Sequence, residues 1–364
     1  MDEPTIADVA RCAGVSSSTV SRHLMGQQVR AKEAIDAAVV ALGYRPSPIA
    51  QSLRSGKTFT IAVVVPDISN PFFGGVVKGA ESIARTRGYS LALYNTDESA
   101  DVESDIVDRL HGRVDGIILA PSVESDTAPL RLREYGVPVV FLDREITGPS
   151  LFDTVLVDNE GGTRQAVSHL LNLGHRRVGV IRGPVASTPA RSRYESFRET
   201  LSLHGLNPDE APCEDGDFRE SGGHQAMLRL LARPHPPTGV FVCNNEMTVG
   251  ALRALRDLGI VIPDEMSLVG FDDHALAALL MPPLTVVDRP VDEQGAIAMR
   301  LLLRRLSGST DEPPRRIVLE TNLVVRGSTA PPSGSDSQIA AKVSRTTDVV
   351  RSAQPSPTPN RRPQ

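Results

Sequence analysis

The stretch that decides the organisation of the chain is T-I-A-D-V-A-R-C-A-G-V-S-S-S-T-V-S-R-H-L, residues 5–24. Thr5 and Asp8 have the spacing of a capping box, so we expect a helix to begin there. Gly14 can adopt the left-handed conformation that ends a helix. Ser16 is a suitable N-cap for a second helix. The stretch therefore predicts two short helices joined by a tight turn.

Two helices joined in this way have helix-turn-helix geometry, in which the second helix enters the major groove of DNA. Arg22 is the strongest candidate for base contact, because its guanidinium can bond bidentately to guanine. Ser17 and Ser18 are further candidates, since their short hydroxyls can bond several bases. An ordinary helical hairpin with a polar face is the alternative. Phosphate contacts, which set the register without carrying sequence information, are expected from Thr5, Thr19 and Ser21.

Length and composition limit the class of protein. The chain has 364 residues, enough for two or three domains, and its 40% hydrophobic content is ample for real cores. The net charge is −5, yet residues 1–57 hold seven Lys and Arg against five Asp and Glu. Because the acidic remainder repels phosphates, nucleic-acid contact is expected only of the N-terminal segment. The three cysteines lack disulfide or metal-ligand spacing, and no signal peptide or membrane-spanning run is recognisable, so a cytoplasmic protein is expected.

A connecting segment follows a third helix that is predicted over residues 34–44. Two prolines in R-P-S-P-I-A-Q-S-L-R (45–54) end that helix, and Pro48 suits the first position of a new one, ending near Arg54. So short a helix is unstable alone and forms only against a partner. Leu53 is then either an ordinary packing residue or an apolar wedge that enters the minor groove between base pairs.

Strand and helix patterns alternate over residues 59–326. One example is F-T-I-A-V-V-V (59–65), followed by a helical pattern over 73–87. The alternation occurs in two series, which favours two lobes, each a parallel sheet with helices on both faces. From residue 327 onward hydrophobic periodicity fades, so a disordered tail is expected at 327–364.

Ligands of such sheets bind beyond the carboxyl ends of the strands. Carboxylates, amides and arginines that face each other there, above an aromatic floor, suit a ligand with many hydroxyl groups. Strand-end Asp and Asn side chains can instead cap the following helix. The residues at these strand ends are Asp67, Asn70, Phe72, Phe73, Ser122, Asp143, Arg144, Asn244 and Asp272.

Several motifs, in this order, closely resemble those of the LacI/GalR family of bacterial transcription regulators. They are D-V-A-R-C-A-G-V-S-S-S-T-V-S-R (8–22), L-G-Y-R-P-S (42–47), A-Q-S-L (50–53), N-P-F-F (70–73), L-G-H-R-R-V-G-V-I (173–181) and I-P-D-E-M-S-L-V-G-F-D-D (262–273). The resemblance runs from Thr5 to about Arg326. This chain departs from the usual members at Met25, where they have Asn, and at V-R-A-K-E (29–33), which lacks the capping hydroxyl of the third helix.

The resemblance implies an α + α/β protein. An N-terminal helix-turn-helix head and a hinge helix precede a two-lobed, periplasmic-binding-protein-like core of doubly wound parallel sheets. The expected segments are the head at 1–45, the hinge helix at 46–57, the effector-binding and dimerisation core at 58–326 and the tail at 327–364. Within the core, the first lobe is expected at about 58–158 plus 290–318, and the second at about 160–288 plus 319–326.

The resemblance also implies the function. It predicts a ligand-responsive regulator, most simply a repressor, that binds a palindromic operator as a homodimer. Leu53 of each paired hinge helix is then expected to intercalate at the central base step. The effector, a sugar or sugar derivative, is expected to rotate the lobes and change the distance between the hinge helices. Matching to the family assigns effector binding to Phe73, Asp143, Arg193, Asn244 and Asp272, with Arg144, Ser122 and Asn159 as weaker candidates.

Catalysis is not expected. N-P-F-F-G-G (70–75) does not supply the G-x-G-x-x-G turn of a dehydrogenase, and no G-x-S-x-G nucleophile elbow is present. The histidines show no metal-ligand spacing, so neither cofactor nor metal is predicted. A two-lobed solute-binding protein without a regulatory role is the alternative, although it would need an export signal where this chain has a DNA-reading head. We expect a protein that associates with the nucleoid.

Overall fold

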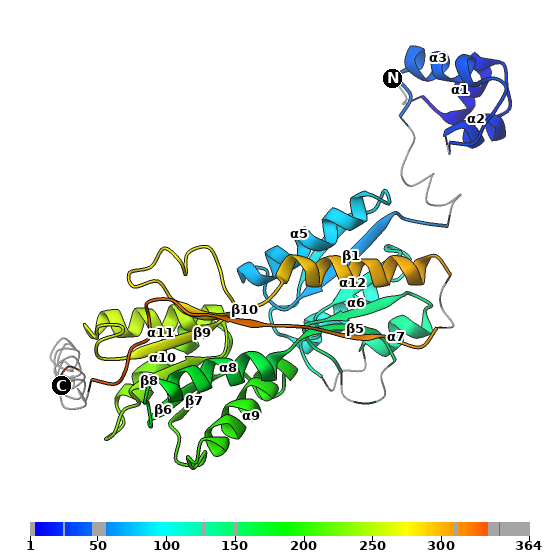
Figure 1. Cartoon of the computed structure of the whole chain (residues 1–364). Coiled ribbons are helices and arrows are strands. Elements are labelled where there is room, and N and C mark those ends of the chain that lie inside the picture. Colours follow the sequence, from blue (N-terminus) through cyan, green and yellow to red (C-terminus); the bar gives the residue numbers. More distant parts are fainter. Residues whose placement is uncertain are drawn as a thin grey trace, which may run out of the picture. The chain divides into compact units, whose positions relative to one another are not determined.

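The computed structural model describes residues 4–24, 26–45, 56–124, 128–146, 148, 151–308, 312–333 and 342 (Figure 1). The chain divides into two compact units. One contains residues 1–60 with 112–115, and includes the head. The other contains residues 61–111 with 116–364, and is the core.

The head consists of three helices, α1 (Ile6–Ala13), α2 (Ser17–Leu24) and α3 (Lys32–Leu42). The capping box forms, because the Asp8 carboxylate accepts hydrogen bonds from the Thr5 amide at 3.0 Å and from its hydroxyl at 2.6 Å. Gly14 ends α1 with φ of 65°, a left-handed conformation that glycine adopts without strain. The predicted pair of helices and their turn are thus confirmed.

A small apolar core holds the three helices together. It is built from Val9 and Ala10 of α1, Val20 of α2, and Ile35 and Ala38 of α3. These side chains recur at helical spacing, so each helix turns one apolar face inward. Helix α3 begins at Lys32, and its cap residue has no side-chain hydrogen bond, as the missing hydroxyl in 29–33 predicts.

The first lobe of the core is a six-stranded sheet in the order β11-β5-β4-β3-β1-β2. Its strands are β1 (Thr60–Val65), β2 (Ser90–Asn95), β3 (Gly116–Leu119), β4 (Val139–Leu142), β5 (Asp153–Val157) and β11 (Arg316–Leu319). The neighbouring strands from β11 to β1 all pair in parallel. The covering helices are α5 (Pro71–Arg85), α6 (Ala100–Leu110), α7 (Ala128–Glu134) and α12 (Val291–Leu306).

Helices α5 and α12 lie side by side on one face of this sheet (Figure 1). Ile61, Val63 and Val65 of β1 belong to the same core cluster as these helices, while the buried alternate residues face the other side. Gly79 of α5 and Gly295 of α12 allow the close approach. A Cβ atom at either position would collide with the backbone of the opposite helix.

The second lobe repeats the architecture with the strand order β12-β10-β9-β8-β6-β7. Its strands are β6 (Val178–Arg182), β7 (Cys213–Asp215), β8 (Gly239–Val242), β9 (Ser267–Phe271), β10 (Thr285–Asp288) and β12 (Asn322–Val324). Among the described strands of this lobe, only β12 runs antiparallel to its neighbour. The helices are α8 (Asn159–Asn172), α9 (Thr188–Leu203), α10 (Glu220–Leu231) and α11 (Asn245–Asp257).

The chain crosses between the lobes three times, after β5, after β10 and after β11. The first lobe therefore combines residues 60–157 with 291–319, and the second combines 159–288 with 322–333. Because both parallel sheets direct the carboxyl ends of their strands toward these crossings, the residues that follow the strands meet between the lobes. The predicted fold class, with a head followed by a two-lobed core, is confirmed.

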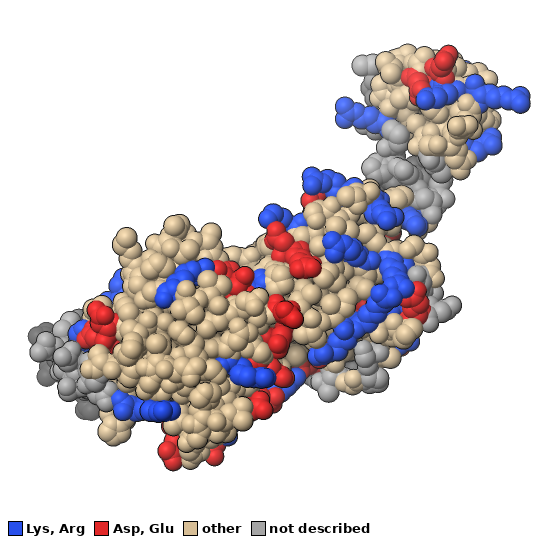
Figure 2. Space-filling model, viewed as in Figure 1, with Lys and Arg blue, Asp and Glu red and all other residues tan. Residues whose placement is uncertain are grey.

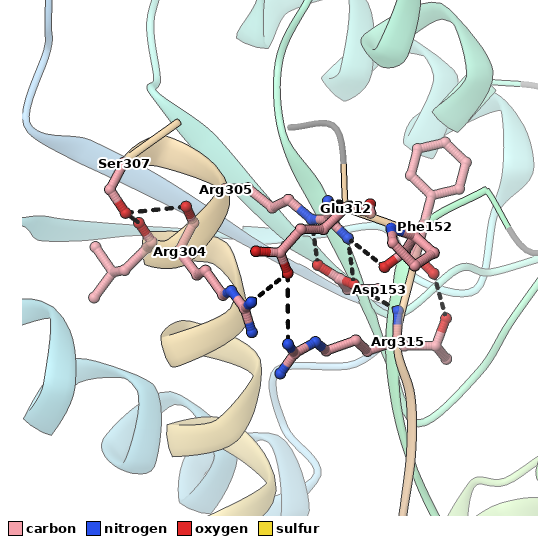
Figure 3. A network of polar contacts seen from close by, with 10 residues as sticks. Phe152, Asp153, Arg304, Arg305, Ser307, Glu312 and Arg315 are labelled. Atoms are coloured by element: carbon pink, nitrogen blue, oxygen red, sulfur yellow. Dashed lines mark hydrogen bonds and ion pairs between the residues drawn. The ribbon is translucent and has the colours of Figure 1, made fainter. Parts of the chain in front are cut away.

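Polar contacts also fix the start of β5 and the segment that follows β12. Asp153, at the start of β5, accepts two hydrogen bonds from the Arg305 guanidinium at 2.7 and 2.8 Å and one from the Arg315 amide at 2.7 Å (Figure 3). At the other end of the core, Ser328 donates to the Leu268 carbonyl at 2.6 Å. Residues 327–333, which the sequence assigned to the tail, thus pack on the second lobe, and the predicted boundary at 327 falls inside this packed segment.

Candidate functional sites

The candidate DNA-reading side chains lie on the surface of the head. Ser17, Ser18 and Arg22 of α2 are exposed, and Arg22 makes no ion pair with any residue that the structure describes. Figure 2 shows basic side chains projecting from the head. The exposed basic residues of the described head are Arg11, Arg22, Arg30, Lys32 and Arg45. An exposed, unpaired guanidinium on the second helix has the freedom that base contact requires.

Three of the predicted hydroxyl groups already have partners within the head. The hydroxyl of Ser16 lies 2.8 Å from that of Ser18 and 2.9 Å from that of Thr19, and it accepts the Thr19 amide at 3.2 Å. Thr5 donates its hydroxyl to Asp8. Each hydroxyl has a single proton and a phosphate only accepts hydrogen bonds, so Thr5 must release Asp8 before it can contact a phosphate. Ser21 is half-buried, and Leu53 lies outside the described residues.

The core brings all five predicted effector residues to one small cavity between the lobes. Asp143 follows β4 and Phe73 lies on α5 in the first lobe, while Arg193, Asn244 and Asp272 belong to the second. The cavity has a volume of about 30 Å³. Asp143 and Asp272 both adopt left-handed backbone conformations, with φ of 65° and 75°. Asp tolerates this region better than most residues, and the sharp turn directs each carboxylate into the cleft.

Arg193 is held rigidly by the second lobe. Its Nε donates to Asn159 Oδ1 at 2.8 Å, and its Nη1 donates to the Cys243 carbonyl. The guanidinium carbon Cζ lies 3.6 Å from the centre of the Phe271 ring. Burial lowers the pKa of Arg193 to about 10, against the opposing attraction of Asp272. The side chain therefore stays charged at neutral pH and its orientation is fixed by three partners.

Two of the predicted residues also have the structural roles that strand-end residues commonly have. Asn244 Oδ1 caps α11 by accepting the Met247 amide at 3.0 Å, while its Nδ2 donates to the Phe218 carbonyl at 2.9 Å. Phe73 is buried in the core of the first lobe and packs edge-on against Phe72. The capping alternative therefore holds for Asn244, and both residues line the cavity.

The weaker candidates separate into different places. Arg144 lines the cavity and forms a bidentate ion pair with Glu98, with both distances 2.7 Å. Asn159 acts through Arg193 and does not line the cavity itself. Ser122 is hydrogen-bonded to Thr96 at 2.6 Å, beside the site but not in its wall.

Sequence reasoning missed Arg289. It stands between β10 and α12, at a crossing between the lobes, and its Nη1 donates to Asp143 Oδ1 at 2.5 Å. Its Nε lies 2.6 Å from Asp272 Oδ1, and its guanidinium stacks 3.5 Å from the centre of the Phe72 ring. The sequence does carry a signal, because the short β-branched run T-V-V-D (285–288) directly precedes Arg289, but this run is not among the predicted strands.

The carboxylates and guanidinium groups around Arg289 stabilise one another's charged forms. Burial alone would raise the pKa of Asp143, yet the guanidinium groups of Arg289, Arg193 and Arg144 outweigh it and hold that pKa below its ordinary value. Burial likewise opposes the charge of Arg289, but Asp272 and Asp143 raise its pKa. The site thus holds fixed carboxylate acceptors and guanidinium donors in one dehydrated space.

No group of three His, Cys, Asp or Glu side chains that could hold a metal occurs among the described residues. Nor does any helix in the described part of the chain have the length and hydropathy to cross a membrane.

Comparison with known proteins follows the division into head and core. The family described as bacterial regulatory proteins, lacI family, matches residues 5–47, and the periplasmic binding protein-like domain matches residues 167–329. The ribose operon repressor of Escherichia coli (strain K12) is 36% identical over 332 residues, covering 89% of this chain and 99% of that repressor. The chain belongs to the LacI family. This membership confirms the predicted transcription regulator and the prediction that the chain is not an enzyme.

Other relatives of this LacI-family regulator agree. The transcriptional regulator CelR of Thermobifida fusca is 37% identical over 335 residues, covering 89% of this chain and 98% of CelR. A structure of the CelR–cellobiose complex matches with a TM-score of 0.70 and 36% identity, over 89% and 99% of the two chains. The lac repressor dimer bound to operator and the anti-inducer ONPF matches with a TM-score of 0.80 and 27% identity, over 90% and 100%. A bacterial regulator of this family acts on DNA, and hence in the cytoplasm.

Proposed function

We propose that this LacI-family regulator is a repressor that binds a palindromic operator as a homodimer and responds to a sugar or sugar derivative held between the lobes. The observation that carries the proposal is the convergence of Asp143, Arg193 and Asp272 on one cleft, in a chain that also carries a helix-turn-helix head. The head supplies DNA recognition, and the cleft supplies the means of controlling it.

The chemistry of the cleft supports a polyhydroxylated effector. Asp143 and Asp272 are hydrogen-bond acceptors, Arg193 is a fixed donor, and Phe72 and Phe73 provide an aromatic wall. Hydroxyl groups both donate and accept, so a polyol satisfies both kinds of partner at once. The relatives named above regulate a ribose operon or bind cellobiose, which is consistent with this class.

The small size of the cavity bears on how an effector could control DNA binding. About 30 Å³ holds no sugar, whereas small-molecule pockets typically measure roughly 300–1,000 Å³. We propose that the lobes change their relative arrangement when an effector enters. We propose that this change alters the distance between the hinge helices of the two subunits, so that Leu53 enters or leaves the minor groove. The hinge helix and Leu53 lie outside the described residues.

The dimer can use an apolar face of the second lobe. A groove of about 680 Å³ lies beside α11 and the segment that follows β9. Large apolar side chains are exposed there, namely Val249, Val261, Leu276, Leu280 and Met281. Exposed apolar patches of this kind mark interaction surfaces, and the lac repressor with the same fold is described as a dimer. We propose that a second copy of the chain covers this face.

The decisive experiment measures fluorescence anisotropy of labelled palindromic duplexes with the full chain, at one stated salt concentration, with and without a panel of pentoses, hexoses and disaccharides. Specific binding that one sugar changes supports the proposal. Failure to bind any palindromic duplex, in the presence or absence of every sugar, would reject it in favour of a solute-binding protein. The same account places the protein on the nucleoid, and sedimentation of the native protein with nucleoids checks that point.

A further inference from the structure

Arg289 occupies the space in which an effector would be expected. Its side chain reaches Asp143 of the first lobe at 2.5 Å and Asp272 of the second at 2.6 Å. The exposed fractions of the three side chains are 3%, 7% and 5% for Arg289, Asp143 and Asp272. One buried cation therefore joins the two carboxylates that the proposed function assigns to effector binding.

The bridge is incomplete on the side of the second lobe. Arg289 Nε and Asp272 Oδ1 are close enough for an ion pair, yet neither atom has a hydrogen bond of acceptable geometry with any described residue. Buried polar atoms usually have such a partner, so these two are exceptions. A hydroxyl group that entered the cleft could donate to Asp272 Oδ1 and accept from Arg289 Nε, satisfying both atoms.

We propose that Arg289 is an internal occupant of the cleft, which bridges the lobes when no effector is bound and which the effector must displace. This inference rests on the proposed function, because it concerns the same cleft. It accounts for the small volume of the cavity, since the guanidinium lies over the Phe72 ring and between the carboxylates.

The bridge determines which ligands can compete. A displaced guanidinium is costly if it remains buried without an acceptor. The entering ligand must therefore offer donors to Asp143 and Asp272 and, at the same time, acceptor oxygens to Arg289. A compound with several adjacent hydroxyl groups meets both demands, whereas one that carries only donors or only acceptors does not. Arg289 is thus a specificity-determining residue as well as a contact between the lobes.

The test is hydrogen–deuterium exchange of the full chain without DNA or sugar. Peptide 141–146 reports on the contact between lobes, because the Glu145 amide donates to the Thr188 hydroxyl at 3.4 Å across it. In Arg289→Gln this peptide is expected to exchange roughly tenfold faster, the ratio that a population shift of about 1.4 kcal/mol produces. Asp143→Asn, which removes the opposite end of the bridge, is expected to act in the same direction.

Arg219→Gln is the matched control. Arg219 also joins the lobes, through an ion pair with Asp97 at 2.6 Å, but both side chains are largely exposed, at 46% and 68%. Exposed pairs contribute little, so exchange in this variant should equal that of the wild type. If Arg289→Gln exchanges at the wild-type rate, or if Arg219→Gln opens the lobes equally, the proposal is wrong.

If Arg289→Gln does not fold, Asp143→Asn decides by the same criterion. Because DNA and sugar are both absent, a negative result here leaves operator binding untouched. Conversely, failure of the operator experiment would reject the proposed function without changing the exchange rates.

Discussion

The guanidinium of Arg193 lies 3.6 Å from the centre of the Phe271 ring, at the end of the strand that also delivers Asp272 to the cleft. A cation over an aromatic face in a dehydrated site is worth about 2 kcal/mol. The contact fixes Arg193 before any ligand arrives, so little rotamer entropy is lost when an effector binds. This relationship makes Arg193 the most informative position for substitution.

Arg193→Ala is expected to remove the effector response while the head continues to bind operator, because Arg193 lies in the core and not in the head. Because the variant loses one buried, charged donor, its affinity for the effector should fall by about a hundredfold, or about 2.7 kcal/mol. Operator titrations at increasing sugar concentration measure this loss of affinity for the effector. Arg193→Lys, which keeps the charge but loses the fork, serves as the matched variant. An unchanged sugar response in Arg193→Ala would place the effector elsewhere.

Arg22→Lys should lower discrimination at one guanine in each half-site by about 1–3 kcal/mol, because an ammonium cannot reproduce bidentate bonding to O6 and N7. Total charge is conserved, so non-specific affinity and its salt dependence should remain as they are. Binding measured against a set of operators with one substituted base pair per half-site tests this. Equal preference in the two proteins would exclude Arg22 as a base reader.

Leu53→Ala is expected to weaken specific operator binding more than non-specific binding. An intercalating leucine contributes only where the duplex is opened at a fixed step, whereas phosphate contacts are shared by every sequence. The measurement compares the affinity for a palindrome with that for scrambled DNA of equal length. A proportional loss on both duplexes would indicate that Leu53 merely packs within the protein.

Arg305→Met is expected to destabilise the core. Arg305 pairs with Asp153, whose side chain is only 2% exposed, and the substitution leaves that carboxylate buried without its cation (Figure 3). Breaking a buried pair in this way costs about 3–5 kcal/mol. The melting temperature should fall by roughly 6–20 °C, at about 2–4 °C per kcal/mol for a core of this size. Lys78→Met, which removes an exposed pair with Asp292, is the control and should melt close to the wild type.

Acidification below about pH 6.5 is expected to reduce stability through His175. Burial lowers the pKa of His175 below its ordinary value, and its ring contacts the Thr238 and Ser267 hydroxyls and the Ala330 carbonyl. The unfolded chain therefore binds a proton at a pH where the folded chain does not, so stability is present above pH 6.5 and is lost as the pH falls. Melting temperatures between pH 7.5 and 5.5 should decline less steeply in His175→Gln. Identical slopes would refute this role.

Local features were predictable because they depend on neighbouring residues. The capping box of Thr5 and Asp8, the left-handed Gly14 and the alternation of strands with helices all follow from interactions within a few positions. Strand-end reasoning also placed Asp143 and Asp272 near one another, since both sheets present their carboxyl ends at the crossings. Arg193, by contrast, was obtained only through the resemblance to the family.

What the sequence by itself determined is the order of elements, the existence of two lobes and the kind of side chain at each strand end. Only the tertiary structure decided which of these side chains touch. Arg289 meets Asp143 across 146 positions, after the chain has left the first lobe at the end of β5 and reached the crossing that follows β10. The physical reason is that hydrogen-bonding periodicity and capping act over a few residues, whereas the pairing of buried charges depends on how the two sheets pack together.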